Sequence, residues 1–159
     1  GLDGEELVTA WVALSPSSPE SGCMKMLPGS HLEGENPNHD AYGKNNILHR
    51  SQDLEMEVDE DKAVNIELQP GEASLHHGWV VHASHPNKSD DRRIGLSLQY
   101  LTPRMKQKKT EMESALPVRG QDRFNHFLQE RVCTNDFDPA MVTYQAESEI
   151  LKHEVYDTD

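Results

Sequence analysis

Residues 77–100 constrain the fold more than any other part of the chain, because two strand-like runs flank a short polar turn there. Beyond the turn at 85–91, Ile94, Leu96 and Leu98 alternate with small or polar residues, which is typical of a strand with one buried face. His82 precedes Arg93 by eleven residues. This spacing predicts a histidine on one strand beside an arginine at the start of the next strand.

Most of the chain before position 103 shows the same pattern of short runs and turn residues. The expected strands lie at 6–14, 23–27, 54–58, 64–68, 73–77, 79–84 and 94–100. The first of these runs is apolar on both faces, so we expect it at the centre of a sheet. Residues 30–50 are polar and aperiodic, which predicts a long loop.

Helical signals replace strand signals after Pro103. Residues 122–130 are predicted to form a short helix. Asp138 has the chemistry of an N-cap, with Pro139 at the first position of a helix that extends to about His153. Many short strands followed by terminal helices predict one mainly β domain with a sandwich or barrel core.

Charge and cysteine content exclude several classes of partner. The net charge of −13 argues against nucleic acid and against anionic membranes, and we interpret the basic segment 104–109 as a solvated stretch. The longest apolar run, residues 7–14, is too short to span a bilayer. Two cysteines, Cys23 and Cys133, make no disulfide framework, which favours a reducing, cytoplasmic setting.

His82, Ser84 and Arg93 are the residues whose chemistry suggests a site. Ser84 follows His82 by two positions, so both side chains point to the same side of a strand. Imidazole is a suitable ligand for divalent iron, and the planar fork of arginine binds a carboxylate through two hydrogen bonds. Arg92 is an alternative for the carboxylate, since alternation alone does not say which face of the strand lines a pocket.

Further segments extend this pattern over nearly the whole chain. They are Thr9-Ala-Trp-Val-Ala-Leu14, Glu20-Ser-Gly-Cys-Met24, Leu27-Pro-Gly-Ser-His31, Leu75-His-His77, His82-Ala-Ser84 with Asn87-Lys-Ser89 and Arg93, Val118-Arg-Gly-Gln-Asp-Arg123, and His126-Phe127. Together they resemble the phytanoyl-CoA dioxygenase family of Fe(II)- and 2-oxoglutarate-dependent oxygenases. The resemblance implies a double-stranded β-helix, also called a jelly roll, that hydroxylates an aliphatic C–H bond of a small-molecule or acyl substrate.

The resemblance also assigns roles to individual residues. It implies that His82 is the distal histidine of the iron-binding facial triad and that Arg93 holds the far carboxylate of 2-oxoglutarate. Ser84 and Trp11 are expected to line the co-substrate pocket. His77 matches a recurrent family position, where packing behind the ligands is the expected role. Since His76 and His77 point to opposite sides of a strand, at most one of them faces the site.

The chain departs from the family in one large respect. No His-x-Asp pair occurs in its 159 residues. The resemblance implies that the two proximal iron ligands would precede Gly1. The sequence therefore predicts the C-terminal portion of such an enzyme, inactive by itself. We expect an incomplete jelly roll over residues 1–103, a C-terminal extension over 104–159 with one or two helices packing on the core, and a homodimer that covers exposed sheet edges.

Three alternatives stay open at this point. The chain could be a non-catalytic jelly-roll binding or assembly module without a metal site. A rival metal site could combine His31 and Glu33 with His82, although Glu33 enters a loop rather than a strand. The absent His-x-Asp segment also leaves hydroxylase and halogenase undistinguished, because family relatives with a small residue in place of the aspartate bind chloride there.

Overall fold

The computed structural model describes residues 2–41, 51–54, 56–109 and 113–156. Contacts divide the chain into two compact units, residues 7–100 and residues 1–6 together with 101–159. The described residues of the first unit form eight strands and two short 3₁₀ helices. They are β2 (Leu7–Ala13), β3 (Met24–Met26), η1 (Ser30–Glu33), β4 (Asn38–Ala41), β5 (Ser51–Leu54), η2 (Glu60–Lys62), β6 (Val64–Ile66), β7 (Ala73–His77), β8 (His82–Ser84) and β9 (Gly95–Leu101).

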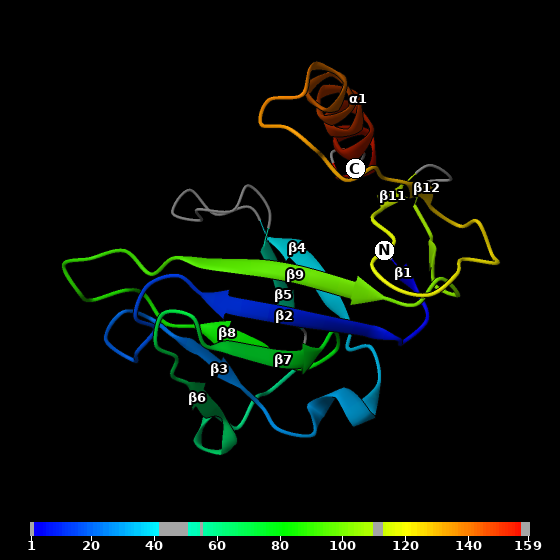
Figure 1. Ribbon diagram of the computed structural model, residues 1–159. Coiled ribbons are helices and arrows are strands. Elements are labelled where there is room, and N and C mark those ends of the chain that lie inside the picture. The colour runs from blue at the N-terminus through cyan, green and yellow to red at the C-terminus, as the bar shows by residue number, and fades with distance from the viewer. Residues whose placement is uncertain (1, 42–50, 55, 110–112, 157–159) are drawn as a thin grey trace. The chain divides into compact units, whose positions relative to one another are not determined.

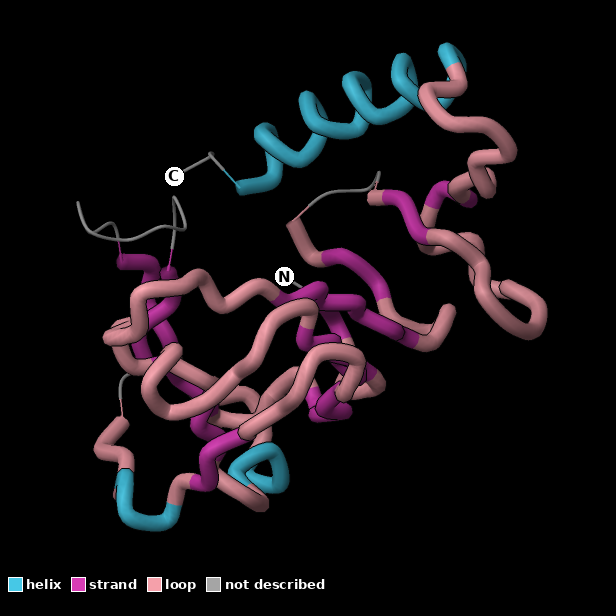
Figure 2. Tube along the Cα trace, turned by 60° about the vertical axis from the view of Figure 1, so that its left-hand side comes forward, coloured by secondary structure: helices cyan, strands magenta, loops and turns pink. Residues whose placement is uncertain are grey.

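Two three-stranded sheets carry the first unit, with strand orders β7-β2-β9 and β6-β3-β8 (Figure 1). Strand β2 pairs antiparallel with β7, and β3 pairs antiparallel with both β6 and β8. Strands β4 and β5 form a separate antiparallel hairpin. Loops make up much of this unit, as the pink tube of Figure 2 shows. The sheets have the mainly β, jelly-roll type of architecture that the sequence predicts, and β2 is central as expected.

The core of this unit is small and lies between residues of β2, β3 and the turn before β8. Its buried apolar side chains are Ala10, Ala13, Cys23, Met24, Met26 and Val81. By contrast, Leu75 on β7 and Leu96 on β9 are 74% and 47% exposed. The apolar face of β9 that alternation predicts to be half-buried is therefore largely uncovered among the described residues.

Each sheet also ends in a strand with one open edge. Within the described part of the chain, β9 pairs only with β2, and β8 pairs only with β3. Unpaired backbone groups along a strand edge are a template for another strand. Within the described residues each sheet has two such edge strands, β7 and β9 in one sheet and β6 and β8 in the other.

The second unit consists of small sheets and one helix. Strand β1 (Leu2–Asp3) pairs antiparallel with β10 (Lys106–Gln107), and β11 (Ser114–Ala115) pairs parallel with β12 (Leu128–Gln129). Helix α1 spans Pro139–Tyr156, and the Asp138 carboxylate accepts a hydrogen bond from the Ala140 N–H at 2.9 Å. The predicted N-cap and proline start are therefore confirmed. None of the described helices is long and apolar enough to cross a membrane.

Several local predictions are wrong. Residues 122–130 form no helix, because the Asp122 carboxylate accepts the backbone N–H groups of Phe124 and Asn125, and Asn125 has a φ of 54°. The predicted loop at 30–50 contains η1 and β4, while residues 42–50 lie outside the described residues. The strand expected at 54–58 is instead 51–54, and the strand expected at 79–84 is shortened to 82–84 by a turn at 78–79.

Candidate functional site

The face of the β7-β2-β9 sheet that carries Trp11 forms the floor of the candidate site. Register places Trp11 opposite Ser74 and Thr9 opposite His76. Residues directly opposite one another in an antiparallel pair have their side chains on the same face. The half-buried Trp11 and the side chains of Ser74 and His76 therefore share one face, and His77, opposite Val8, belongs to the other.

Arg93 lies on this same face. Its guanidinium carbon sits 5.3 Å from the centroid of the Trp11 ring, a cation–π arrangement. Gly95 makes room for the indole, because a Cβ there would lie 2.0 Å from Cζ2 of Trp11. Arg92, the alternative arginine, has the parity of the exposed Leu96 rather than that of Gly95. The contact with Trp11 thus distinguishes the two arginines, which alternation could not do.

The Arg93 guanidinium has an unusual environment for a cation. Its Nη1 atom is buried and has no hydrogen-bond partner among the described residues. Its charge also reaches the buried thiol of Cys23, just before β3. Burial and the carboxylate of Glu67 raise the pKa of Cys23, and Arg93 partly opposes that rise. A buried guanidinium nitrogen without an acceptor is a position where a carboxylate of a ligand is stabilised.

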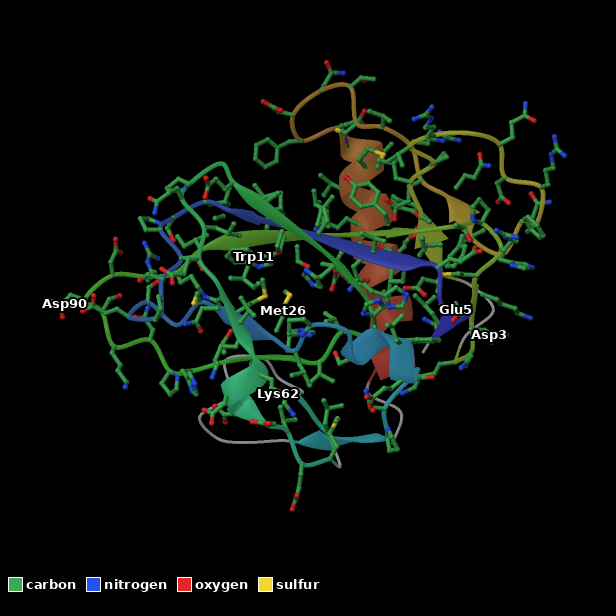
Figure 3. The ribbon with its side chains drawn as sticks, turned by 90° about the horizontal axis from the view of Figure 1, so that it is seen from below. Asp3, Glu5, Trp11, Met26, Lys62 and Asp90 are labelled. Atoms are coloured by element: carbon green, nitrogen blue, oxygen red, sulfur yellow. The ribbon has the colours of Figure 1, made fainter. Side chains whose placement is uncertain are left out.

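Ser15 holds the backbone on both sides of Arg93, a role that the sequence analysis missed. Its hydroxyl donates to the Arg92 carbonyl at 3.1 Å and accepts from the Ile94 N–H at 2.7 Å. The turn that precedes Arg93 is closed by Asn87, whose amide donates to the Asp91 carbonyl at 2.8 Å. The outer tip of that turn, marked by Asp90, lies far from Trp11 and Met26 in Figure 3.

His82 and Ser84 come from the other sheet. The expectation that the strands on either side of the 85–91 turn are neighbours is therefore wrong, because β8 pairs with β3 and β9 belongs to the sheet of β2. Register places them opposite Met26 and Met24 of β3, so these four side chains share one face. Both β8 side chains are exposed, whereas both methionines are buried. Nδ1 of His82 lies 2.8 Å from the Val80 carbonyl oxygen. Since a carbonyl only accepts, Nδ1 carries a proton, and in the neutral tautomer the lone pair is on Nε2.

Ser30 supports the segment that carries His82. Its buried hydroxyl donates to the Leu27 carbonyl and accepts from the Val81 N–H, both at 2.8 Å. The Leu27 N–H in turn donates to the Val81 carbonyl at 2.9 Å. The family resemblance gives the Leu27-Pro-Gly-Ser-His31 segment no role, and this bridge between two loops is its structural contribution.

His76 is the histidine of its pair that faces His82. The ring centroids of His76 and His82 are 5.8 Å apart, whereas His77 packs 5.3 Å from His31 and 5.4 Å from Trp79. Burial, and then the nearby His82, lower the pKa of His76, so its imidazole is neutral at physiological pH. The prediction that at most one of the two neighbours faces the site holds, and it is His76.

Other possible sites are less well formed. Among the described residues no three or more His, Cys, Asp or Glu side chains are grouped to hold a metal ion, so His31 and Glu33 do not form the rival site with His82. An open pocket of 490 Å³ is lined by Lys25, Ala83 and apolar residues of the 54–58 segment. His82 and Ser84 also line this pocket, whereas neither Trp11 nor Arg93 does.

Comparison with known proteins identifies the family. A family model for phytanoyl-CoA dioxygenase (PhyH) matches residues 2–95. The chain belongs to the phytanoyl-CoA dioxygenase family. The peroxisomal phytanoyl-CoA dioxygenase of Homo sapiens is 32% identical over 99 residues, which cover 59% of this chain and 28% of the human protein. A phytanoyl-CoA dioxygenase domain-containing protein 1 of Danio rerio is 36% identical over 84 residues, covering 52% and 29% respectively.

Several solved structures share the fold of this chain. The non-heme monooxygenase ThoJ in its apo form is 34% identical with a TM-score of 0.80, and the match covers 97% of this chain and 56% of ThoJ. EvdO2 from Micromonospora carbonacea var. aurantiaca is 30% identical with a TM-score of 0.53, covering 60% of this chain and 38% of EvdO2. The chain thus spans about half of ThoJ and about a third of the sequence relatives.

Proposed function

We propose that this chain is the C-terminal part of an Fe(II)/2-oxoglutarate-dependent dioxygenase, in which His82 binds iron and Arg93 binds the far carboxylate of 2-oxoglutarate. The observation that carries the proposal is the buried Nη1 atom of Arg93 without a partner in the described part of the chain. A buried guanidinium N–H without an acceptor costs free energy, so this position favours an anionic ligand. A complex of EvdO2 with 2-oxoglutarate, 30% identical with a TM-score of 0.50, supports the choice of diacid.

The residues present fit these two groups. Nε2 of His82 has its lone pair available because Nδ1 donates to the Val80 carbonyl. The Trp11 ring supports the guanidinium of Arg93. We expect Trp11 and Ser84 to line the space for the co-substrate. When bound, iron and 2-oxoglutarate supply the oxidising chemistry that hydroxylates an aliphatic C–H bond of a small-molecule or acyl substrate. The chain itself binds and orients.

The separate polypeptide is expected to be inactive. The described residues hold no group of three metal-binding side chains, and one imidazole with one arginine binds Fe(II) weakly. We therefore expect no succinate to form from 2-oxoglutarate when the chain is incubated with Fe(II) and O₂. The same observation favours a second candidate function, a non-catalytic module that binds a carboxylate ligand at Arg93. Succinate formation above the background rate of free Fe(II) would contradict both the expected inactivity and the second function.

Tryptophan fluorescence tests the carboxylate site directly. The chain has two tryptophans, and a Trp79→Phe variant leaves Trp11 as the single reporter under Arg93. We expect 2-oxoglutarate to quench Trp11 emission saturably in this background. Replacing Arg93 by Met keeps an apolar stem but removes the fork, and should weaken binding at least about tenfold, or 1.4 kcal/mol.

Arg92→Met is the matched control, because it removes the same charge one position away. We expect it to leave the quenching curve within about twofold of the Trp79→Phe parent. The proposal fails if 2-oxoglutarate produces no saturable quenching, or if Arg92→Met abolishes quenching while Arg93→Met retains it. Circular dichroism of each variant verifies that the β fold is kept.

Two further properties belong to the same proposal. The open edges of β8 and β9 should be covered by a second copy of the chain, so light scattering after size exclusion is expected to give a dimer mass. A stable monomer would contradict this. Cys23 and Cys133 are both free thiols, which supports a reducing, cytoplasmic setting. Imaging a tagged protein in its native cells tests the compartment.

A further inference from the structure

A second imidazole faces His82 across the candidate site. His76 on β7 and His82 on β8 belong to different sheets, yet their ring centroids lie 5.8 Å apart with an interplanar angle of 51°. Their neighbour His77 cannot take this place, because it pairs with Val8 on the other face of the β7-β2-β9 sheet. Of these two histidines, only His76 therefore lies next to His82.

Both rings have Nδ1 next to an oxygen atom of their own strand or turn. Nδ1 of His82 donates to the Val80 carbonyl at 2.8 Å, and Nδ1 of His76 lies 3.4 Å from the hydroxyl oxygen of Ser74. Histidines that bind metals commonly engage the other ring nitrogen in such a hydrogen bond, which sets the orientation of the ring. The arrangement leaves Nε2 of each ring as the atom available to an ion.

The distance between the rings suits a shared ion. Because a metal–imidazole bond is about 2.0–2.1 Å, two rings bound to one ion have centroids roughly 4.5–6.4 Å apart, depending on the angle at the metal. The observed 5.8 Å lies inside this range. A phenylalanine of similar volume at position 76 would fill the same space, so packing alone does not require imidazole there.

We propose that His76 and His82 bind one divalent transition-metal ion together through their Nε2 atoms. The inference rests on the proposed function for the role of His82, and adds a protein ligand from the Trp11 face. Imidazole pairs favour the later first-row ions, so Ni²⁺, Zn²⁺ and Cu²⁺ should bind more tightly than Fe²⁺. Since Ser74 is paired with Trp11, His76 lies on the same sheet face as Trp11, against which Arg93 packs.

Calorimetric titration of the full chain with Ni²⁺ tests the pair without any need for turnover. We expect one ion per chain, and a loss of affinity of at least tenfold in both His76→Phe and His82→Phe. His77→Phe is the matched control, because it makes the same substitution one position along β7 on the opposite face. It should bind Ni²⁺ within about threefold of the original chain.

Histidine ring spectra provide a second readout. In a long-range ¹H–¹⁵N correlation spectrum, Zn²⁺ should shift the Nε2 resonances of both His76 and His82 and leave their Nδ1 resonances near their starting positions. If His76→Phe fails to fold by circular dichroism, His76→Gln takes its place, since it keeps a polar side chain of moderate size without the imidazole.

The outcomes separate the two proposals. If His82→Phe loses Ni²⁺ but both His76 variants retain it, His82 acts without His76, and the inference is wrong while the proposed iron ligand stands. If His76→Phe, His82→Phe and His77→Phe all bind Ni²⁺ as tightly as the original chain, the metal lies elsewhere. Neither His76 nor His82 is then a metal ligand. Loss of binding in His77→Phe alone would place the ion on the opposite face of the sheet and overturn the inference.

Discussion

Replacement of Ser30 by alanine tests how the chain fixes the strand that carries His82. The Ser30 hydroxyl is the acceptor for the Val81 N–H at 2.8 Å, and Val81 is itself only 8% exposed. Alanine therefore leaves a backbone donor buried where water has little access. An unsatisfied buried donor costs about 1–3 kcal/mol. The bond from Ser30 to the Leu27 carbonyl is lost as well, which places the expected change in the middle or upper part of that range.

Urea unfolding followed by tryptophan emission measures this change. Both tryptophans, Trp11 and Trp79, belong to the unit of residues 7–100 that contains Ser30, so the signal reports on this unit. We expect Ser30→Ala to lower the free energy of unfolding by about 2 kcal/mol. In a chain of this length that corresponds to a fall in Tm of about 4–8 °C. The slope of the urea transition should not change, because the surface exposed on unfolding is the same.

Ser148→Ala provides the comparison. The hydroxyl of Ser148 donates to the Gln145 carbonyl within α1, and a carbonyl in a helix keeps its backbone partner when the serine is removed. A substitution of this kind is expected to stay within about 0.5 kcal/mol of the original chain. If Ser30→Ala also stays within that limit, the Val81 N–H has another acceptor, and the argument that Ser30 positions the strand of His82 is refuted.

Two other predictions concern the packing near Arg93. Gly95→Ala places a Cβ 2.0 Å from Trp11, so the indole must move. We expect overpacking to lower the free energy of unfolding by about 1–3 kcal/mol and to shift the Trp11 emission maximum in a Trp79→Phe background. An unchanged emission maximum would contradict the contact. Burial raises the pKa of Cys23, so less of its thiol is ionised at any pH and its reaction with iodoacetamide at pH 8 should be slower than that of the exposed Cys133. Equal rates in the folded protein, measured by mass spectrometry, would contradict the burial of Cys23.

The elements that could be predicted are those whose pattern is local. Strand β9 follows from alternation between 94 and 100, the central position of β2 from its two apolar faces, and the start of α1 from Asp138 and Pro139. The helix expected at 122–130 failed because a side chain competed with the helix for the same donors. The Asp122 carboxylate takes the N–H groups of Phe124 and Asn125, and this turn is as local as the helical pattern that it replaces.

The pairing of strands β4 and β5 could not be predicted from either strand alone. Residues 38–41 are polar and lack clear alternation, and their strand conformation depends on hydrogen bonds to residues 51–54. Similarly, the bridge from Ser30 to Val81 joins residues 51 positions apart in the chain. Nothing in the composition of either loop indicates the other, because such a contact exists only once both sheets are formed.

The candidate site divides along the same line. The residue types and the eleven-residue spacing of His82 and Arg93 can be read from the amino-acid sequence. So can the opposite directions of His76 and His77, since a strand repeats every two residues. Which of these directions leads to the Trp11 face depends on strand pairing. Pairing with β2 puts His76 and not His77 on the Trp11 face, and stacking on Trp11 selects Arg93 over Arg92. Alternation specifies two faces, but register and the packing of one sheet against the other decide which of them encloses a site.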